Sequence, residues 1–350
     1  MSQFIQLHML TNYAPANINR DDLGRPKTAK MGGVDRLRIS SQSLKRAWRT
    51  SDIFEETMKG NIGKRTKLFG VEVFNYLKEK GVSEGKAKKW AQAIAARFGK
   101  LKGADKNKPL ADLEIEQLAH ISPEEKDAAL SLCNTLAEEN REPNEDELQL
   151  LRKDIRAADI ALFGRMLAKY PSFNIEAAAQ VAHAITVNRV VVEDDYFTAV
   201  DDLNTGDEDS GSAHIGESGF GSGVFYTYLC INKSLLEENL GGPELANKAV
   251  RALAHAAATV SPSGKQNSYA SRARALYILA EKGSQQPRQL SSAFLKPVDN
   301  ADMANEAINR LTALCENMDK VYGKCADRRC SINVEKAEGT FDELLDFVGA

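Results

Sequence analysis

Residues 36–49 read RLRISSQSLKRAWR, a short alternating segment that passes directly into a helix signal. Basic and aliphatic residues alternate over 36–39, which predicts a strand. Ser40 or Ser41 is typical of a helix N-cap, and we expect the helix to end near Ser51. A strand followed at once by an amphipathic helix indicates a protein that mixes the two kinds of element.

The predicted helix has two unlike faces. At about 100° per residue, Leu44, Ala47 and Trp48 share an apolar face that we expect to pack on a sheet. The other face carries an amide and three cations, namely Gln42, Lys45, Arg46 and Arg49. The hydroxyls of Ser40 and Ser41 and the helix N-terminus favour a phosphate. This face is either a phosphate-binding surface or an ordinary solvated helix face.

Outside this segment, strands are predicted near both ends of the chain, with helices between them. Alternating or continuous apolar runs predict strands at 4–13, 187–192, 224–231 and 275–280. Helical spacing of apolar residues predicts helices at 66–80, 84–98, 123–140, 144–170, 174–185, 243–260, 301–321 and 340–348. This order predicts an α+β fold, with a split βαβ sheet, helices on one face and a large helical insertion.

Residues 193–223 differ from their surroundings. Eight acidic and no basic residues occur between Glu193 and Asp209, and the stretch SGSAHIGESGFGSG follows at 210–223. We expect a long loop or a protruding hairpin, the kind of segment where function is often found. Tyr196 and Phe197 at its base are candidates for stacking on bases, although buried hairpin aromatics are commoner.

Charge is unevenly distributed along the 350 residues. The net charge is −3, but residues 1–51 carry +6, residues 52–58 carry −3, residues 59–108 carry +10 and residues 109–350 carry −16. Basic regions attract phosphate backbones, and regions of opposite sign favour head-to-tail assembly. The loop before the helix therefore predicts binding to a nucleic-acid strand of any sequence, through Arg20, Arg25, Lys27, Lys30 and Arg36.

The sequence gives only weak signals for catalysis, metal binding or disulfide bonds. Asp21, Asp22 and Asp35 are candidate metal ligands for phosphodiester cleavage, but acids in turns more often accept backbone hydrogen bonds or pair with arginines, and we favour that interpretation. The chain has no HExxH, Walker, GxSxG or GxGxxG motif, and its five cysteines form no CxxC pair. We expect reduced thiols, no metal and no cofactor. No apolar run approaches a membrane span and no secretory leader precedes the first strand, so a cytoplasmic protein is expected.

Ten short stretches, in order along the chain, resemble a known family. They are FIQLHML at 4–10, NRDD at 19–22, GG at 32–33, RISSQSLKRA at 38–47, DIALFGRM at 159–166, AHAIT at 182–186, FTAVDDL at 197–203, GSAHIG at 211–216, SGVFY at 222–226 and ENLGG at 238–242. Each is weak alone, but the ordered set is similar to the type I-E CRISPR-associated Cascade backbone subunits, the repeated guide-RNA-binding subunits of the CasC-like family. The resemblance extends to about Tyr269.

The resemblance implies a hand-like fold and a role in antiviral defence. An RRM-like (ferredoxin-like) palm is expected at 1–59 and 187–350, helical fingers at 60–186 and a β-hairpin thumb within the palm at 193–223. The implied role is a non-catalytic backbone that polymerises head to tail along the CRISPR guide RNA (crRNA) and presents it to target DNA. Its partners would be the guide, other copies of itself and the remaining Cascade subunits in one ribonucleoprotein, with no membrane.

The resemblance also implies which residues contact RNA. The helix face and the preceding loop would grip the guide backbone, while Met166 and Phe197 would bracket a displaced base. The candidate RNA-binding residues are Arg20, Lys27, Arg38, Ser40, Gln42, Lys45, Arg46, Arg49, Met166, Tyr196, Phe197, Lys265 and Gln266. The lysine-rich residues 59–108 are a candidate contact with target DNA on charge alone.

Two alternatives stay open. In the first, the chain is a backbone subunit that cuts target RNA with a metal held by Asp21, Asp22 or Asp35. In the second, it is a general single-stranded nucleic-acid-binding protein that needs no guide. The first predicts metal-dependent cleavage, and the second predicts equal binding to random RNA.

Overall fold

The computed structural model describes residues 2–199 and 214–350 and divides into two compact units. The sheet unit comprises Met1–Phe54, Gln180–Cys230 and Val250–Ala350, and the helical unit comprises Glu55–Ala179 and Ile231–Ala249. These limits differ from the predicted palm and fingers limits by a few residues and by the placement of 231–249. Part of the predicted thumb, 200–213, lies outside the described residues.

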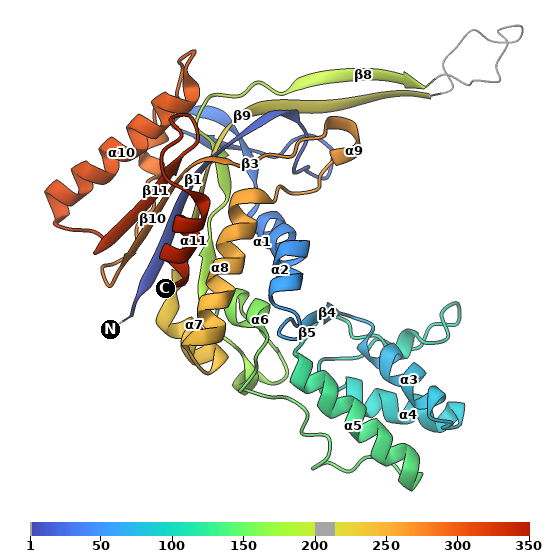
Figure 1. Ribbon diagram of the computed structural model, residues 1–350. Coiled ribbons are helices and arrows are strands. Elements are labelled where there is room, and N and C mark those ends of the chain that lie inside the picture. Colours follow the sequence, from blue (N-terminus) through green and yellow to red (C-terminus); the bar gives the residue numbers. More distant parts are fainter. Residues whose placement is uncertain (1, 200–213) are drawn as a thin grey trace, which may run out of the picture. The chain divides into compact units, whose positions relative to one another are not determined.

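A sheet of nine strands, counted over the described residues, forms the sheet unit (Figure 1). Its order is β11-β10-β1-β9-β7-β3-β2, and β6 and β8 also pair with β9. The pairs of β10 with β1 and β11, of β3 with β2 and β7, and of β9 with β7 and β8 are antiparallel. The strands are β1 (Phe4–Ala16), β2 (Thr28–Met31), β3 (Val34–Ile39), β6 (Ala179–Val181), β7 (Ala184–Thr186), β8 (Glu193–Ala199), β9 (His214–Asn232), β10 (Ala275–Gly283) and β11 (Arg328–Asn333).

Helices pack on both faces of this sheet. Tyr277 and Leu279 of β10 pack with Leu311 of α10 (Met303–Tyr322) in one hydrophobic cluster. Lys282, of opposite parity on the strand, lies with its Nζ 5.3 Å from the ring centre of Phe347 in α11 (Phe341–Gly349). Because alternate residues of a strand point to opposite faces, α10 and α11 cover different faces. The expectation of helices on one face is therefore wrong.

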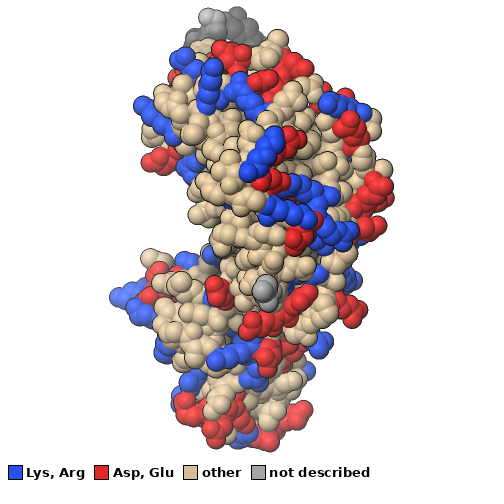
Figure 2. All heavy atoms as spheres, turned by 90° about the vertical axis from the view of Figure 1, so that its left-hand side faces the viewer, with Lys and Arg blue, Asp and Glu red and all other residues tan. Residues whose placement is uncertain are grey.

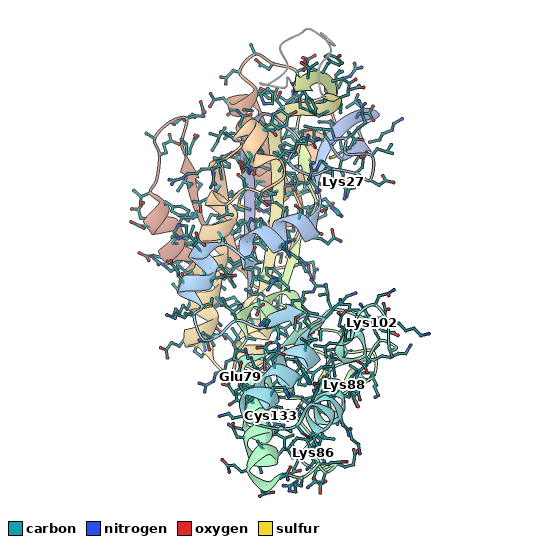
Figure 3. The ribbon with its side chains drawn as sticks, turned by 90° about the vertical axis from the view of Figure 1, so that its right-hand side faces the viewer. Lys27, Glu79, Lys86, Lys88, Lys102 and Cys133 are labelled. Atoms are coloured by element: carbon teal, nitrogen blue, oxygen red, sulfur yellow. The ribbon has the colours of Figure 1, made fainter. Side chains whose placement is uncertain are left out.

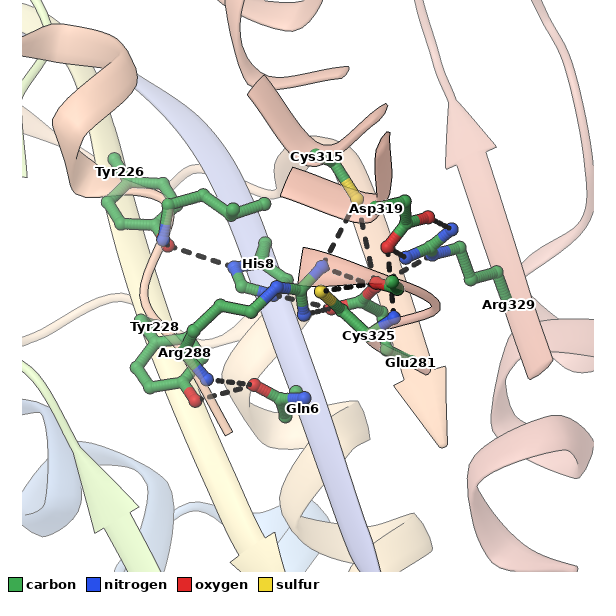
Figure 4. Close-up of polar contacts among 12 residues, drawn as sticks. Gln6, His8, Tyr226, Tyr228, Glu281, Arg288, Cys315, Asp319, Cys325 and Arg329 are labelled. Carbon is green, nitrogen blue, oxygen red and sulfur yellow. Dashed lines mark hydrogen bonds and ion pairs between the residues drawn. The ribbon is translucent and has the colours of Figure 1, made fainter. Parts of the chain in front are cut away.

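A buried polar network lies under α10 (Figure 4). The fully buried Glu281 carboxylate accepts from the guanidinium groups of Arg288 and Arg329 and lies 3.2 Å from His8 Nε2. Burial would raise the pKa of Glu281, but the hydrogen bonds from His8 and Arg288 outweigh it and hold that pKa well below its usual range. Burial lowers the pKa of His8, so its ring is neutral, with Nδ1 2.9 Å from the hydroxyl of Tyr226.

The helical unit has its own hydrophobic core, with Phe69, Trp90, Leu113 and Leu136 fully buried. The helices predicted at 66–80, 84–98 and 123–140 are confirmed as α3 (Phe69–Glu79), α4 (Glu84–Ala95) and α5 (Pro123–Glu139). The remaining helices and strands of this region are α2 (Asp52–Thr57), β4 (Lys64–Thr66), β5 (Ala119–Ile121), α6 (Ala158–Phe163) and α7 (Lys233–Leu240). The sheet unit contains α1 (Ser41–Arg49) and α9 (Gln266–Tyr269), and the boundary between the two units falls within α8 (Pro243–Thr259).

The helix predicted at 144–170 is wrong, because only the short α6 forms within it. The backbone N–H groups of Arg152 and Arg156 donate to the carboxylates of Glu125 and Glu124, at 2.9 and 3.0 Å. Side-chain acceptors on α5 therefore replace the carbonyl acceptors that a helix would offer. The apolar spacing in this stretch reflects packing on the core and not a helical backbone.

The helix predicted at 174–185 and the strand predicted at 187–192 are also wrong. The chain forms β6 and β7 at 179–186, and Ile185 pairs with Arg38 on one side and Tyr226 on the other. Strands of three residues have partners far away in the sequence, so the local pattern carries little information about them. The strands β2 and β11 were also missed; β2 is a short arm of a hairpin with β3, and β11 pairs with β10 about 50 residues earlier in the chain.

Candidate nucleic-acid interface

Helix α1 forms as predicted, with Ser40 as its N-cap. The Ser40 Oγ accepts from the Ser43 N–H at 3.3 Å, and the Ser40 N–H donates to Asn19 Oδ1 at 2.9 Å. Leu44 and Trp48 are buried, as the apolar face of the helix requires. Ser40 is only 7% exposed, so its first task in this structure is to start the helix.

The polar side chains of α1 differ in their exposure to solvent. Gln42 and Arg46 are exposed, whereas Lys45 and Arg49 are half-buried. Burial lowers the pKa of Lys45. Half-buried cations keep their alkyl stems on apolar surface and hold their charged ends in a restricted region. The arrangement suits a ligand that lies along the helix.

The loop between β1 and β2 contains a compact turn held by Asp21. Its Oδ1 accepts from the N–H groups of Leu23 and Arg25, at 3.0 and 2.9 Å. The turn returns the chain so that Lys27 donates from its backbone to Asn19 and accepts from the backbone of Arg38, both at 2.8 Å. The interpretation of Asp21 as a turn residue is confirmed. The turn brings Lys27 beside Arg38, near the end of β3 and the start of α1 (Figure 3).

An open pocket of about 490 Å³ lies beside α1 within the sheet unit. Its polar lining includes Arg20, Asp21, Arg46 and Thr50, and the loop 262–264 closes one side. A Cβ on Gly264 would lie 2.0 Å from the carbonyl oxygen of Ile18, so only glycine allows this close approach. The pocket places two of the candidate arginines on one surface.

Lys265 and Gln266 follow this loop, and both are half-buried. Lys265 is half-buried, with a left-handed φ of 48°, at the start of α9. The Gln266 amide donates to the Pro262 carbonyl at 3.1 Å and lies 3.3 Å from the hydroxyl of Ser271. The Gln266 amide therefore holds the loop together.

His183 joins this surface; it lies in the family-like stretch AHAIT at 182–186 but was not among the candidate RNA-binding residues. Its Nδ1 lies 3.2 Å from the backbone nitrogen of Ser41 and 3.3 Å from the Arg38 guanidinium. Partial burial, with Arg38 and Lys27 nearby, lowers the pKa of His183. No motif spacing marks a histidine whose partners are about 140 residues away.

The hairpin of β8 and β9 holds the two aromatic candidates. Tyr196 and Phe197 are 66% and 42% exposed, so neither is a buried hairpin aromatic. Phe197 pairs with Gly216, and a Cβ there would lie 2.3 Å from the ring, so the ring lies across the glycine. The successive side chains point to opposite faces of the hairpin. At its base, the hydroxyls of Ser218 and Tyr269 lie 3.0 Å apart and join the hairpin to α9.

Met166 is the one candidate in the helical unit, where it is 85% exposed. The residue before it is fixed: Arg165 is buried, and its guanidinium donates to the Glu125 carboxylate at 2.6 Å. Arg165 and Ile175 also exchange two backbone hydrogen bonds of 3.0 Å. An exposed methionine on an anchored loop is an apolar side chain at a fixed backbone position, and all other candidate RNA-binding residues belong to the sheet unit.

A model of the CT1975-like protein family matches residues 5–346, almost the whole chain. The chain belongs to the CT1975-like family. It is also similar to a chain in a solved "CRISPR RNA-guided surveillance complex, pre-nicking", with 28% identity, 99% of each chain covered and a TM-score of 0.86. A chain of another "CRISPR RNA-guided surveillance complex" shares the fold, with 23% identity, 99% of each chain covered and a TM-score of 0.74. No curated protein matches the chain.

These matches confirm the resemblance to Cascade backbone subunits on which the candidate residues were chosen. They also confirm a mixed α+β fold with an antiparallel sheet as the fold of this CT1975-like chain. The role of each residue stays a prediction.

In the folded protein, acidic residues from outside the stretch lie beside many of the basic residues at 59–108. Acidic residues from 112–145 pair with its lysines, as in Lys88–Asp112 at 3.0 Å, Lys89–Glu142 at 2.7 Å and Lys102–Glu114 at 2.6 Å. Lys86, Lys88 and Lys102 lie on the surface of the helical unit (Figure 3). Basic and acidic groups are also interspersed over the face in Figure 2.

Arg36 is the clearest exception among the basic residues of the loop before α1. It is fully buried and donates to the carbonyls of Met31, Thr186, Val187 and Phe294. Arg36 therefore ties β3 to neighbouring segments and is removed from any surface. The prediction that it attracts a nucleic acid is wrong.

Three further observations bear on other kinds of site. All five cysteines carry free thiols, and Cys133, Cys230 and Cys315 are buried. Over residues 2–199 and 214–350, no three His, Cys, Asp or Glu side chains gather as a metal site would require. In the same part of the chain, no helix combines the length and the apolar character needed to cross a bilayer.

Proposed function

We propose that the protein is a non-catalytic, guide-RNA-binding backbone subunit of a type I-E CRISPR Cascade complex. In this proposal the sheet unit is an RRM-like palm, the helical unit is the fingers and the β8–β9 hairpin is the thumb. Copies of the chain assemble head to tail along the crRNA in the cytoplasm. The guide pairs with target DNA, so base pairing reads the sequence and the protein reads the backbone.

The observation that carries the proposal is the polar surface around α1. One short helix presents Gln42, Lys45, Arg46 and Arg49, and the preceding turn adds Lys27 beside it. Lysine and arginine contact phosphates without reading bases, which suits a guide whose sequence varies. The similarity to a chain of a CRISPR RNA-guided surveillance complex supports the same assignment.

Two exposed apolar groups fit a further part of the proposal. Phe197 lies on the hairpin, and Met166 lies on its anchored loop. Aromatic and apolar side chains of this kind stack on or wedge between bases. Within a filament, the thumb of one copy would fold over RNA held by the next, and these side chains would bracket a displaced base.

Direct binding tests the RNA surface. Anisotropy of a labelled guide RNA is measured at several salt concentrations for the wild type and for Lys45→Glu/Arg49→Glu. We expect the double variant to bind more weakly and its log K against log salt slope to fall by about 1.4, because about 0.7 is lost per single-strand phosphate contact. Lys320→Glu/Lys324→Glu, the same charge change at exposed lysines in and after α10, is the matched control. An equal loss in both variants would contradict the assignment.

The alternative of metal-dependent cleavage has a separate test. The Asp21 carboxylate accepts two backbone hydrogen bonds, which supports a structural role. Target RNA complementary to the guide is incubated with the protein and Mg²⁺ or Mn²⁺. We expect intact RNA, whereas cleavage that disappears in Asp21→Ala, Asp22→Ala or Asp35→Ala would establish the enzyme. The general-binding alternative predicts equal affinity for random and repeat-containing RNA.

A further inference from the structure

His183 lies at the junction from which α1 starts. It follows β6 and precedes β7, and β7 pairs with β3 through Ile185 opposite Arg38 and Ala184 opposite Ile39. This register brings a partly exposed imidazole beside the last residues of β3 and the first residue of α1. The candidate RNA surface therefore contains a residue that sequence reasoning omitted.

The hydrogen bonds of His183 fix the protonation of its ring. The Nδ1 atom faces the N–H of Ser41 at 3.2 Å and the guanidinium of Arg38 at 3.3 Å, and both of these groups can only donate. Nδ1 must therefore accept and carries no proton. A neutral imidazole with a bare Nδ1 has its proton on Nε2.

The charges around the ring favour the same neutral form. Partial burial lowers the pKa of His183, and the positive charges of Arg38 and Lys27 lower it further. Among the residues that the structure describes, Nε2 makes no hydrogen bond. The ring is thus held from one side and offers an N–H donor on the other.

We propose that His183 is a further RNA-binding residue, whose Nε2–H donates a hydrogen bond to a phosphate oxygen of the RNA held at α1. This inference rests on the proposed function and adds a residue to the same surface. A neutral donor adds a hydrogen bond to a phosphate without adding a third positive charge beside Arg38 and Lys27. The hydrogen bonds at Nδ1 already orient the ring, so the Nε2–H donor does not lose orientational freedom when RNA binds.

Two conservative substitutions distinguish a contact of His183 with RNA from a role in which His183 only accepts a hydrogen bond at the start of α1. In His183→Asn, the shorter side-chain amide would reach only the position of Nδ1, so its oxygen can still accept from the Ser41 N–H. In His183→Gln, the longer side-chain amide reaches the position of Nε2 and can supply the outward donor. Capping predicts that asparagine substitutes well, whereas RNA contact predicts that glutamine substitutes better.

Anisotropy with labelled guide RNA, together with thermal unfolding, tests the proposal on the full chain. We expect His183→Asn to weaken RNA binding about tenfold, as for one hydrogen bond to a charged group, with little change in Tm. We expect His183→Gln to bind within about threefold of the wild type. Wild-type affinity in His183→Asn, or equal weakening in both variants, would overturn the proposal. If the wild type itself does not bind guide RNA, the proposed function fails first.

A second measurement needs no variant to fold. The five histidines of the wild-type protein are labelled with ¹⁵N, and long-range ¹H–¹⁵N spectra assign the tautomer of each ring. We expect His183 to be the Nε2–H tautomer at pH 7, and its Nε2 resonance to shift when guide RNA is added. An Nδ1–H tautomer, or an Nε2 resonance that RNA leaves unchanged, would contradict the inference.

Discussion

Two buried guanidinium groups hold surface segments of this protein in place. Arg165 fixes the loop that projects Met166, and Arg36 fixes β3, the strand that leads into α1. Arg165 donates to the Glu125 carboxylate, whereas Arg36 donates only to backbone carbonyls, so each buried guanidinium has hydrogen-bond acceptors around it. From sequence, Arg36 was expected to attract a nucleic acid and Arg165 was given no role, because burial depends on partners up to 258 residues away.

Replacing Arg165 removes the partner of a buried carboxylate. Arg165→Met is expected to destabilise the protein by about 3 to 5 kcal/mol, because Glu125 would keep an uncompensated charge in the core. Glu125→Gln/Arg165→Met should recover part of the loss. Urea unfolding measures both, with Arg152→Met as the control at an exposed position, where less than about 0.5 kcal/mol is expected. A loss in the control as large as in Arg165→Met would contradict this account.

His8 makes stability depend on pH in a defined direction. Burial holds the pKa of His8 in the folded protein below its ordinary value of 6.5. Below pH 6.5, the unfolded chain therefore binds a proton on His8 that the folded protein does not bind. The unfolding free energy should therefore fall as the pH drops below 6.5, by up to about 1.4 kcal/mol per pH unit for this group, until the folded pKa is reached.

Denaturant unfolding between pH 7 and pH 5 measures this slope. His183 and His255 shift in the same direction and add to it, so the comparison with His8→Gln isolates His8. The variant should show a shallower dependence by about one proton. Identical slopes in the two proteins would show that the buried ring is not the source.

At the scale of the element, α1 shows which structural features a local sequence pattern can predict. Its N-cap, its limits and its buried Leu44 and Trp48 follow from local spacing and were predicted. The capping partner Asn19 and the neighbour His183 were not, because both come from other segments. Helices with strong local signals were found in the same way, whereas β7 and β11 depend on sheet partners and were missed.

Ser40 has a structural role that a substitution can separate from RNA contact. Ser40→Ala should cost about 1 kcal/mol, because the Ser43 N–H loses its acceptor. Ser40→Asp keeps a good N-cap and should preserve stability, but its negative charge should weaken guide-RNA binding. Thermal unfolding and anisotropy are measured on the same samples. Undiminished RNA affinity in Ser40→Asp would place the RNA away from this end of α1.

The hairpin offers a test of whether the position of Phe197 matters. Gly216→Val puts a side chain where the Phe197 ring lies, since even a Cβ would be 2.3 Å from it. We expect RNA affinity to fall as much as in Phe197→Ala, with the sheet unit still folded. Ser222→Val, at an exposed position of the same strand, is the control. Wild-type affinity in Gly216→Val would exclude a stacking role for the ring.

At the scale of the whole molecule, the sequence predicted the fold class better than it predicted how charge is distributed in the folded protein. Strands near both ends with a helical region between them indicated an α+β protein, and the family match confirms the resemblance behind the candidate residues. The excess of lysine at 59–108 overstates the local positive charge, because carboxylates distant in sequence pair with several of those lysines in the folded chain. Charge counted along a chain ignores such pairs.

The central claim is that the protein carries guide RNA on the α1 surface. Tagged protein is purified from cells that express the genes beside its own, and the bound RNA is sequenced for the wild type and for Lys45→Glu/Arg49→Glu. We predict one uniform class of short spacer-plus-repeat RNAs in a large complex, lost in the double variant. Wild-type protein that purifies alone or with heterogeneous RNA would contradict the claim and favour general single-strand binding.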